Sequence, residues 1–305
     1  MPATFLSAHR VEKPWGRHDL APLFEDQPQD RPPVGEIWFE DDKPRELLVK
    51  YLFTSARLSV QVHPDDAAAQ ARGFARGKDE AWIILSAEPH STIALGLTEP
   101  MEADAVRAAA LDGSIEQKLY WKSVAAGEVI YSPAGTIHAI GAGLRIIEIQ
   151  QNLDLTYRFY DYGSDRELHL DEAMEVSDFG PFVGNPAPRD IGCGRSVLAE
   201  NGRFVMERWT LDGAFTLAPG SATLWLLPVD GRAVIDGQPA EIGDAIIVEG
   251  AASIEIEAGS LIYVAYPGSR VITDILTPMP PLGFAEEARR RRLDLDGFRL
   301  NQPES

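Results

Sequence analysis

Four polar side chains, spread over three segments of the sequence, are of the types that bind a divalent metal ion. Gln61 and His63 alternate with valines and would face one side of a β-strand. Glu80 opens an apolar run, and His138 follows a Pro-Ala-Gly turn. Together they form an N₂O₂ donor set that suits Zn²⁺, but also Mn²⁺, Fe²⁺ or Co²⁺. Without a thiolate, such a set is typical of a catalytic metal site rather than a structural one.

A structural interpretation of the same residues stays open on spacing alone. A single His, Glu or Gln is more commonly a hydrogen-bonded interior or surface group than a ligand, and His63 before Pro64 could cap a turn. The remaining histidines have no comparable neighbours and are predicted to be structural or surface residues. These are His9, His18, His90 and His169.

Short strands are predicted to position these residues, because β-branched or alternating runs recur between Gly, Pro and Asp. The predicted strands cover residues 47–53, 58–62, 81–85, 91–95, 129–132, 145–150, 204–211, 222–228, 233–235, 245–248, 253–256 and 261–265. Helices are predicted over residues 99–111, 114–120 and 171–176. Many short strands favour β-barrels or sandwiches over βαβ units.

A weak internal repeat predicts two such barrels. The segments 127–135 and 243–251 both read as a strand that ends in a turn. The first turn leads to His138, whereas the second leads to Ser253. We therefore expect only the first barrel to hold a metal ion.

The expected domain division follows these strands. We predict a metal-binding barrel, a helical insertion, a linker, a degenerate second barrel and a C-terminal extension. They cover, in this order, residues 1–98 with 121–180, 99–120, 181–188, 189–275 and 276–305.

Composition narrows the choice of partners. The chain has 305 residues with 28 basic and 47 acidic side chains, so its net charge of −19 argues against nucleic-acid or anionic-membrane binding. Cys193 is the single cysteine, which excludes an internal disulfide and fits the cytoplasm. No signal peptide or long apolar run is visible, and we expect a cytoplasmic monomer or homodimer. The basic run Arg289 to Arg292 is predicted to be a solvated helix end or terminal extension.

Several motifs in a fixed order resemble a known family. The pattern Gly127-x₅-Pro133-x-Gly135-x₂-His138 matches the second cupin motif. Further matching segments are Lys13-Pro14-Trp15-Gly16, Gly35-Glu36-Ile37-Trp38, Ser59 to Asp66, Lys78-x-Glu80, Glu148 to Asn152 and Thr156 to Gly163. Over roughly residues 10 to 265, the chain resembles the type I mannose-6-phosphate isomerases, in particular their short bacterial forms. The resemblance implies two cupin-like β-barrels, or jelly rolls, with a small helical insertion.

The resemblance also implies roles for individual residues. It implies that Gln61, His63, Glu80 and His138 hold one zinc ion per chain. It implies that Arg158 acts in catalysis and that Ser59 and Lys78, with Arg158, bind the phosphate of a sugar phosphate. The chain departs from the pattern of this family at two places. The aromatic run after Glu80 is reduced to Ala81-Trp82-Ile83, and the helical insertion is shortened to residues 99–120.

The family reaction interconverts mannose 6-phosphate and fructose 6-phosphate by moving a proton between C1 and C2 through an enediolate. A base must carry this proton, and Glu148 is the preferred candidate because it lies on a predicted strand ten residues before Arg158. The alternative is a structural carboxylate paired with Arg145 or Arg158. Likewise, Lys78 could be an ordinary solvated lysine after Gly77.

Two other functions stay open. The chain could be a non-catalytic cupin that binds a sugar phosphate, or a cupin oxygenase or isomerase that acts on another substrate. An oxygenase would prefer more histidine ligands and Fe²⁺.

Overall fold

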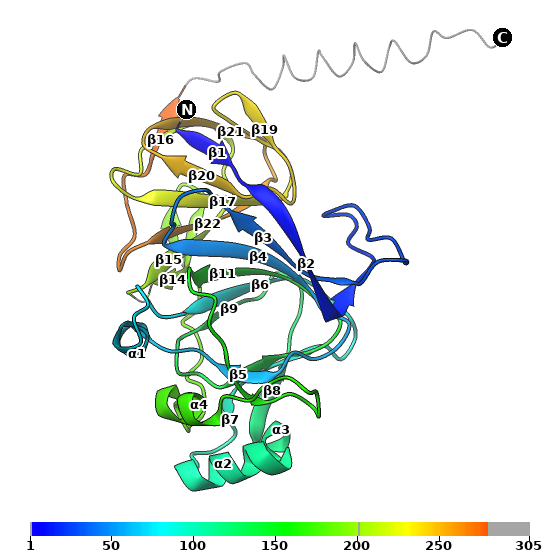
Figure 1. Cartoon of the computed structure of the whole chain (residues 1–305). Coiled ribbons are helices and arrows are strands. Elements are labelled where there is room, and N and C mark those ends of the chain that lie inside the picture. The colour runs from blue at the N-terminus through cyan, green and yellow to red at the C-terminus, as the bar shows by residue number, and fades with distance from the viewer. Residues whose placement is uncertain (1, 201, 280–305) are drawn as a thin grey trace, which may run out of the picture. The chain divides into compact units, whose positions relative to one another are not determined.

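The computed structural model describes residues 2–200 and 202–279, and these are mainly β-strand, as predicted (Figure 1). The chain forms two compact units. The metal-ligand candidates lie in the first unit, Ser7–Ala187. The second unit begins at Pro188 and also includes the described N-terminal residues up to Leu6.

The first unit consists of two antiparallel sheets. The six-stranded sheet has the order β2 (Ser7–Arg17), β3 (Val34–Glu40), β4 (Leu47–Phe53), β11 (Leu144–Gln151), β6 (Glu80–Ala87), β9 (Val129–Ser132). The five-stranded sheet has the order β12 (Tyr157–Tyr160), β5 (Val60–Val62), β10 (His138–Ile140), β7 (Thr92–Leu97), β8 (Leu119–Ser123). These paired sheets confirm the cupin-like fold that the motifs predict.

Alternation along β5 places the first two ligand candidates. Val60 and Val62 are fully buried in an apolar cluster with Phe159, so the residues between and after them face the opposite side. Gln61 and His63 thus point to one face, as predicted. Pro64 follows directly and ends the strand because it has no N–H for the ladder.

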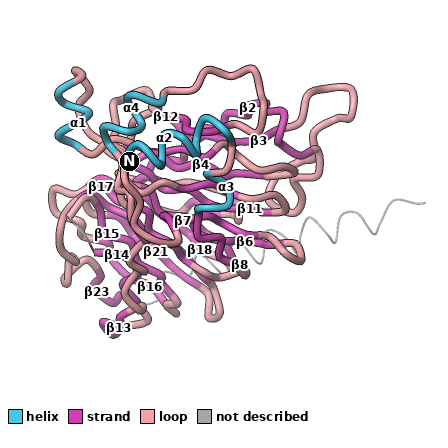
Figure 2. Tube along the Cα trace, turned by 90° about the horizontal axis from the view of Figure 1, so that it is seen from below, coloured by secondary structure: helices cyan, strands magenta, loops and turns pink. Residues whose placement is uncertain are grey.

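Four short helices belong to the first unit: α1 (Asp66–Ala71), α2 (Ala103–Asp112), α3 (Ile115–Lys118) and α4 (Leu170–Val176). In Figure 1, α2, α3 and α4 lie close to β5, β7 and β8, and Figure 2 shows the helices beside the strands from below. Helix α1 was not predicted. It is a six-residue alanine-rich turn that the Asp65 side chain caps by accepting from Ala68 N at 2.8 Å. No helix in the described part of the chain is long and apolar enough to cross a membrane.

The second unit repeats the two-sheet plan. One sheet has the order β1 (Ala3–Phe5), β20 (Ile246–Glu249), β17 (Thr223–Asp230), β22 (Leu261–Pro267), β15 (Phe204–Trp209), β14 (Arg195–Glu200), β13 (Arg189–Gly192). The other has the order β19 (Gln238–Ala240), β18 (Ala233–Ile235), β21 (Ala252–Ile256), β16 (Gly213–Leu217), β23 (Leu276–Met279). Aliphatic and aromatic side chains fill the space between them.

The predicted domain division needs two corrections. Strand β1 pairs with β20, so the N-terminal residues belong to the second unit and not to the first. Strand β23 pairs with β16, so residues 276–279 are part of the second unit's sheet rather than an extension. Both errors arise because strand pairing, which joins residues far apart in sequence, leaves no local signal. The run Arg289 to Arg292 lies outside the described residues.

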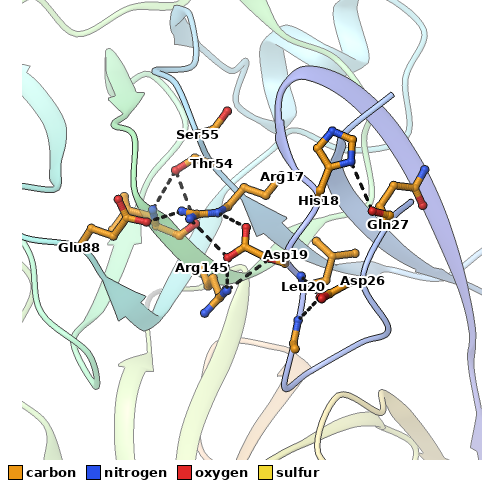
Figure 3. Close-up of polar contacts among 12 residues, drawn as sticks. Arg17, His18, Asp19, Leu20, Asp26, Gln27, Thr54, Ser55, Glu88 and Arg145 are labelled. Carbon is orange, nitrogen blue, oxygen red and sulfur yellow. Dashed lines mark hydrogen bonds and ion pairs between the residues drawn. The ribbon is translucent and has the colours of Figure 1, made fainter. Parts of the chain in front are cut away.

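A network of exposed charges fastens the loop after β2 to the first unit (Figure 3). Arg17 contacts Asp19 at 3.0 Å and Glu88 at 2.6 Å, and Arg145 contacts Asp19 at 2.9 Å. We call these four residues the surface ion cluster. Asp26 stabilises a turn within this loop, because its Oδ1 accepts a hydrogen bond from the backbone N–H of Leu20 at 2.8 Å.

Candidate active site

Three buried side chains from different strands of the first unit converge on one point. His63 follows β5, Glu80 opens β6 and His138 opens β10. The Nε2 atom of His63 lies 3.3 Å from Glu80 Oε1, and that of His138 lies 3.5 Å from Glu80 Oε2. All three ligand atoms lie within 4.8 Å of one another, which makes this a group that could hold a metal ion.

Gln61, the fourth predicted ligand, lies beside this group. It pairs directly with His138 across β5 and β10, and its Nε2 lies 3.3 Å from His138 Nε2. Its Oε1 accepts a hydrogen bond from the Ser59 hydroxyl at 3.1 Å. A metal ion prefers the amide oxygen, so Gln61 would bind one after its amide group turns over, which exchanges oxygen and nitrogen.

Backbone carbonyls fix the orientation of both imidazoles. The Nδ1 atom of His63 lies 2.9 Å from Leu155 O, and that of His138 lies 2.9 Å from Thr136 O. Burial lowers the pKa of His63 to about 4 and also lowers that of His138. Each ring is therefore neutral at pH 7, donates its Nδ1–H to the carbonyl and turns the Nε2 lone pair toward Glu80, as in many metal sites.

Glu80 gives a direct test of whether a metal ion fits here. Both of its carboxylate oxygens are buried and have no partner with hydrogen-bonding geometry. Burial opposes ionisation, but the neighbouring ammonium group of Lys78 holds the pKa of Glu80 well below its usual range. A buried carboxylate facing two imidazole lone pairs needs a cation, and this donor set fits a divalent metal ion.

Lys78 supplies part of that positive charge. Its Nζ lies 2.8 Å from Glu80 Oε1 and 3.3 Å from His63 Nε2. Burial opposes its charge, yet the nearby Glu80 and Glu148 raise its pKa above the usual value. Lys78 is only 4% exposed, so the alternative of an ordinary solvated lysine is wrong.

Glu148, the predicted base, lies in the middle of β11 and is buried. Its Oε2 accepts a hydrogen bond from Trp82 Nε1 at 3.0 Å, and its Oε1 lies 3.7 Å from Lys50 Nζ. Burial, together with the charge of Glu80, raises the pKa of Glu148 to about 7. Its partner is thus Lys50, and not Arg145 or Arg158 as the structural alternative assumed. A carboxyl group with a pKa near neutrality can both accept and return a proton.

A cavity of about 350 Å³ opens next to these residues. It is lined by the predicted site residues Ser59, Gln61, Lys78, Glu148 and Arg158. Basic side chains exceed acidic ones in its lining by two, although the whole chain carries a charge of −19. Such a cavity suits a small anionic ligand.

Arg158 lies on β12, opposite Gln61. Its Nη1 donates to Glu167 O at 3.3 Å and lies 3.4 Å from His169 Nδ1. Burial, with the charge of Arg166, lowers the pKa of Arg158 below its ordinary value. Arg166 also lines the cavity, held by two hydrogen bonds of 2.6 Å to the Asp161 carboxylate.

Several cavity residues were not predicted. His169 was expected to be structural or at the surface, but it lines the cavity beside Arg158. Lys50 could have been found from the sequence, because it is the one charged residue in the apolar run Leu47–Phe53. All seven residues of this strand are buried in the structure. Arg166 lies in a loop without a recognisable pattern, and nothing local distinguishes it.

Comparisons with known proteins show what the chain as a whole is similar to. No protein-family model matches the chain. A mannose-6-phosphate isomerase of Streptococcus mutans is 36% identical over 176 residues, which is 55% of each chain, so this match spans little more than half of that relative. A mannose-6-phosphate isomerase of Bacillus subtilis is 31% identical over 218 residues, which is 66% of this chain and 68% of the relative.

Solved structures extend the likeness to nearly the whole fold. The crystal structure of a Bacillus subtilis mannose 6-phosphate isomerase matches with a TM-score of 0.73 and 25% identity, covering 86% of this chain and 98% of that one. A zinc-bound mannose 6-phosphate isomerase matches with a TM-score of 0.67 and 14% identity, covering 88% and 100%. The second likeness concerns the fold alone.

Proposed function

The chain belongs to the mannose-6-phosphate isomerase family, and from this we propose that it interconverts mannose 6-phosphate and fructose 6-phosphate. The observation that carries the proposal is the convergence of His63, Glu80 and His138 beside a cavity that Glu148 and Arg158 line. A metal-ligand group, a carboxyl group of near-neutral pKa and a guanidinium are the parts that an aldose–ketose isomerisation requires.

The proposed metal ligands are His63, Glu80, His138 and Gln61, and the proposed ion is Zn²⁺, with one ion per chain. A divalent ion bound there would polarise the substrate carbonyl or orient the oxygens on C1 and C2. The neutral imidazoles and the ionised Glu80 are already in the protonation states that metal binding needs.

Glu148 is the proposed base that moves the proton between C1 and C2. Its carboxylate takes the proton from one carbon, and the resulting carboxylic acid returns it to the other. Trp82 fixes one carboxyl oxygen, while Lys50 lies near the other. Arg158 is the proposed stabiliser of the negative charge that develops on the enediolate oxygens.

Ser59, Lys78 and Arg158 are the proposed contacts of the substrate phosphate. All three line the cavity, which supports this assignment. Ser59 and Lys78 already contact Gln61 and Glu80, so substrate binding and metal binding would influence each other. Arg166 adds positive charge to the same lining. A sugar phosphate is therefore the proposed partner, and the cytoplasm is the proposed location because the chain has a single cysteine.

Metal removal and reconstitution test the proposal. The purified protein is treated with a chelator and then assayed for mannose 6-phosphate turnover after addition of Zn²⁺, Mn²⁺, Co²⁺ or Fe²⁺. We expect activity to vanish with the chelator and to return with at least one ion. Glucose 6-phosphate serves as a control substrate of the same charge. Full turnover without any metal would contradict the metal-dependent mechanism, and metal binding without turnover would favour the non-catalytic sugar-phosphate-binding cupin.

A further inference from the structure

A set of buried hydrogen bonds ties together the three segments that carry the metal-ligand candidates. Backbone bonds join His63 O to Gly135 N at 2.9 Å and Pro64 O to Lys78 N at 2.9 Å. The segment after β5 thus contacts both the segment before β6 and the turn before β10. Strands β6 and β9 pair directly, Glu80 with Ser132, but these backbone bonds leave the turn after β9 without a direct link to the segment before β6.

Asp79 provides that link. It stands between Lys78 and Glu80, whose side chains meet at the candidate metal centre, and its own side chain is directed elsewhere. Its Oδ1 accepts the backbone N–H of Ala134 at 2.9 Å, and its Oδ2 accepts the hydroxyl of Tyr131. Asp79 is only 7% exposed. One buried carboxylate therefore holds the turn that leads to His138 against the strand that begins with Glu80.

A second layer of side chains holds Asp79 itself. Gln151 accepts the Asp79 N–H through Oε1 at 3.0 Å, and its backbone N–H donates to Asp79 O at 3.0 Å. The Nε2 group of Gln151 donates to Asp66 Oδ1 at 3.0 Å, and Asp66 also accepts from Gly77 N at 2.8 Å. The backbone of Asp79 is thus fixed from both sides, which leaves its carboxylate little freedom to follow a shifted turn.

Glycine at position 77 permits this close assembly. A Cβ atom there would lie 2.4 Å from the carbonyl carbon of Asp65, a distance that no side chain tolerates. The segment before Glu80 therefore packs backbone to backbone on the turn after His63. Small displacements of one segment would be passed on to the others because there is no free space between them.

We infer that Asp79 is a positioning residue that sets the affinity of this site for a divalent metal ion by locking the Ala134 turn to the Glu80 strand. This inference rests on the proposed metal-dependent function. Asp79 belongs neither to the group of candidate ligands nor to the lining of the cavity, and it acts through His138 and Glu80. Outer contacts of this kind change metal affinity by roughly 10-fold to 100-fold when they are removed.

The test measures the Kd for Zn²⁺ by competition with a chromophoric chelator, independently of activity. For Asp79→Ala we expect the Kd to rise roughly 10-fold to 100-fold. Asp79→Asn keeps an oxygen acceptor for Ala134 N, so its Kd should stay near that of the wild type. Tyr131→Phe removes only the hydroxyl contact and should give an intermediate value. At saturating Zn²⁺ the kcat of Asp79→Ala should recover, because Glu148 and Arg158 are unchanged.

Asp19→Ala in the surface ion cluster is the matched control (Figure 3). It removes an aspartate with two arginine contacts and should leave the Kd for Zn²⁺ unchanged. The inference is overturned if Asp79→Ala binds Zn²⁺ like the wild type, or if Asp79→Asn is as weak as Asp79→Ala. If Asp79→Ala does not fold, the Kd values of Asp79→Asn and Tyr131→Phe for Zn²⁺ still test the inference. A wild-type protein that binds no divalent ion would overturn the proposed function, and the role of Asp79 with it.

Discussion

The two units use the same two-sheet plan but place different polar groups inside it. In the first unit, β9 ends in a turn that leads to His138, and the interior presents a carboxylate to two imidazoles. In the second unit, the equivalent strand β20 ends in a turn that leads to Ser253, and the residues between the sheets are mainly apolar.

A buried carboxylate occurs in both units, yet its surroundings differ. Glu207 in the second unit pairs with Arg195 through two contacts of 2.8 and 2.7 Å. It also accepts from Trp209 Nε1 at 2.7 Å and from Tyr266 OH at 2.5 Å. Both oxygens of Glu207 are therefore hydrogen-bonded, whereas Glu80 has the ion pair of Oε1 with Lys78 and otherwise faces two imidazoles.

This difference separates a structural polar centre from the proposed metal centre. A closed network around a carboxylate adds rigidity and has no capacity for a ligand. A buried carboxylate without such a network carries an energetic cost of desolvation, which a bound cation can remove. We therefore expect substitutions in the first centre to affect metal binding and activity, and substitutions in the second to affect the free energy of unfolding.

The largest expected effect is that of His138→Ala. Loss of one imidazole should abolish metal retention and lower turnover by roughly 10³-fold or more, since metal polarisation of the carbonyl contributes several kcal/mol. Metal content per chain and coupled turnover of mannose 6-phosphate are the measurements. Ser253→His in the second unit is the counterpart and should gain no metal, because the six histidines of the chain all lie in the first unit and the new imidazole would have no second imidazole beside it. Wild-type metal content in His138→Ala would contradict the assignment.

Glu207→Ala should act on stability instead. Removal of one partner leaves the buried guanidinium of Arg195 without its carboxylate, which costs about 3–5 kcal/mol. Urea unfolding measures this change, and metal content should stay at the wild-type level. Arg189→Ala removes the exposed pair with Glu200 on the neighbouring hairpin and should cost less than about 1 kcal/mol. Equal effects of the two variants would remove the distinction between closed and exposed pairs.

Arg158→Ala should lower kcat by roughly 10²-fold to 10³-fold, the usual effect of removing a group that stabilises a developing oxyanion. Metal content should not change, because Arg158 lies outside the ligand group. Steady-state kinetics combined with metal analysis check both expectations. Unchanged kcat would exclude Arg158 from the reaction, and loss of metal would make it a structural part of the first centre.

Glu148 gives a pH-dependent effect in the metal-free protein. Its pKa is raised from 4.5 to about 7 in the folded state, so the folded protein holds this proton more tightly than the unfolded chain. The resulting stabilisation is fully present below about pH 4.5 and disappears as the pH rises through about 7. Relative to Glu148→Gln, which cannot ionise, the wild type should lose on the order of 3 kcal/mol over this range. Parallel pH dependences of unfolding in both proteins would contradict the raised pKa.

Much of the fold could be predicted because most strands carry their own pattern. The ends of β4, β9 and β18 agree with the prediction to the residue. Strands β10 and β19 have three residues each and include the polar His138 and Gln238, whereas the equally short β18 is wholly apolar. Strand β2 has only two buried residues and contains Pro14, so neither alternation nor an apolar run marks it. The pairing of β1 with β20 depends on a contact that no local pattern contains.

The candidate site could be predicted as a set of residues but not as a set of contacts. The four ligand candidates, Glu148 and Arg158 came from residue type and motif order, and the structure brings them to one cavity wall or next to it. The partner of Glu148 could not be predicted, because Lys50 becomes its neighbour only through the register of β4 and β11. The burial of Lys78 and the position of His169 beside Arg158 likewise depend on tertiary packing.

Strand β1 limits how this protein can be divided. Ala3 pairs with Val248, so the strand lies more than 240 residues before its partner in the chain. During synthesis on the ribosome, β1 cannot pair until β20 has emerged. A fragment that starts at residue 188 would expose the backbone edge of β20 and invite aggregation. An expression fragment of the second unit should therefore carry residues 2–6 through a linker, and an affinity tag is better placed away from them.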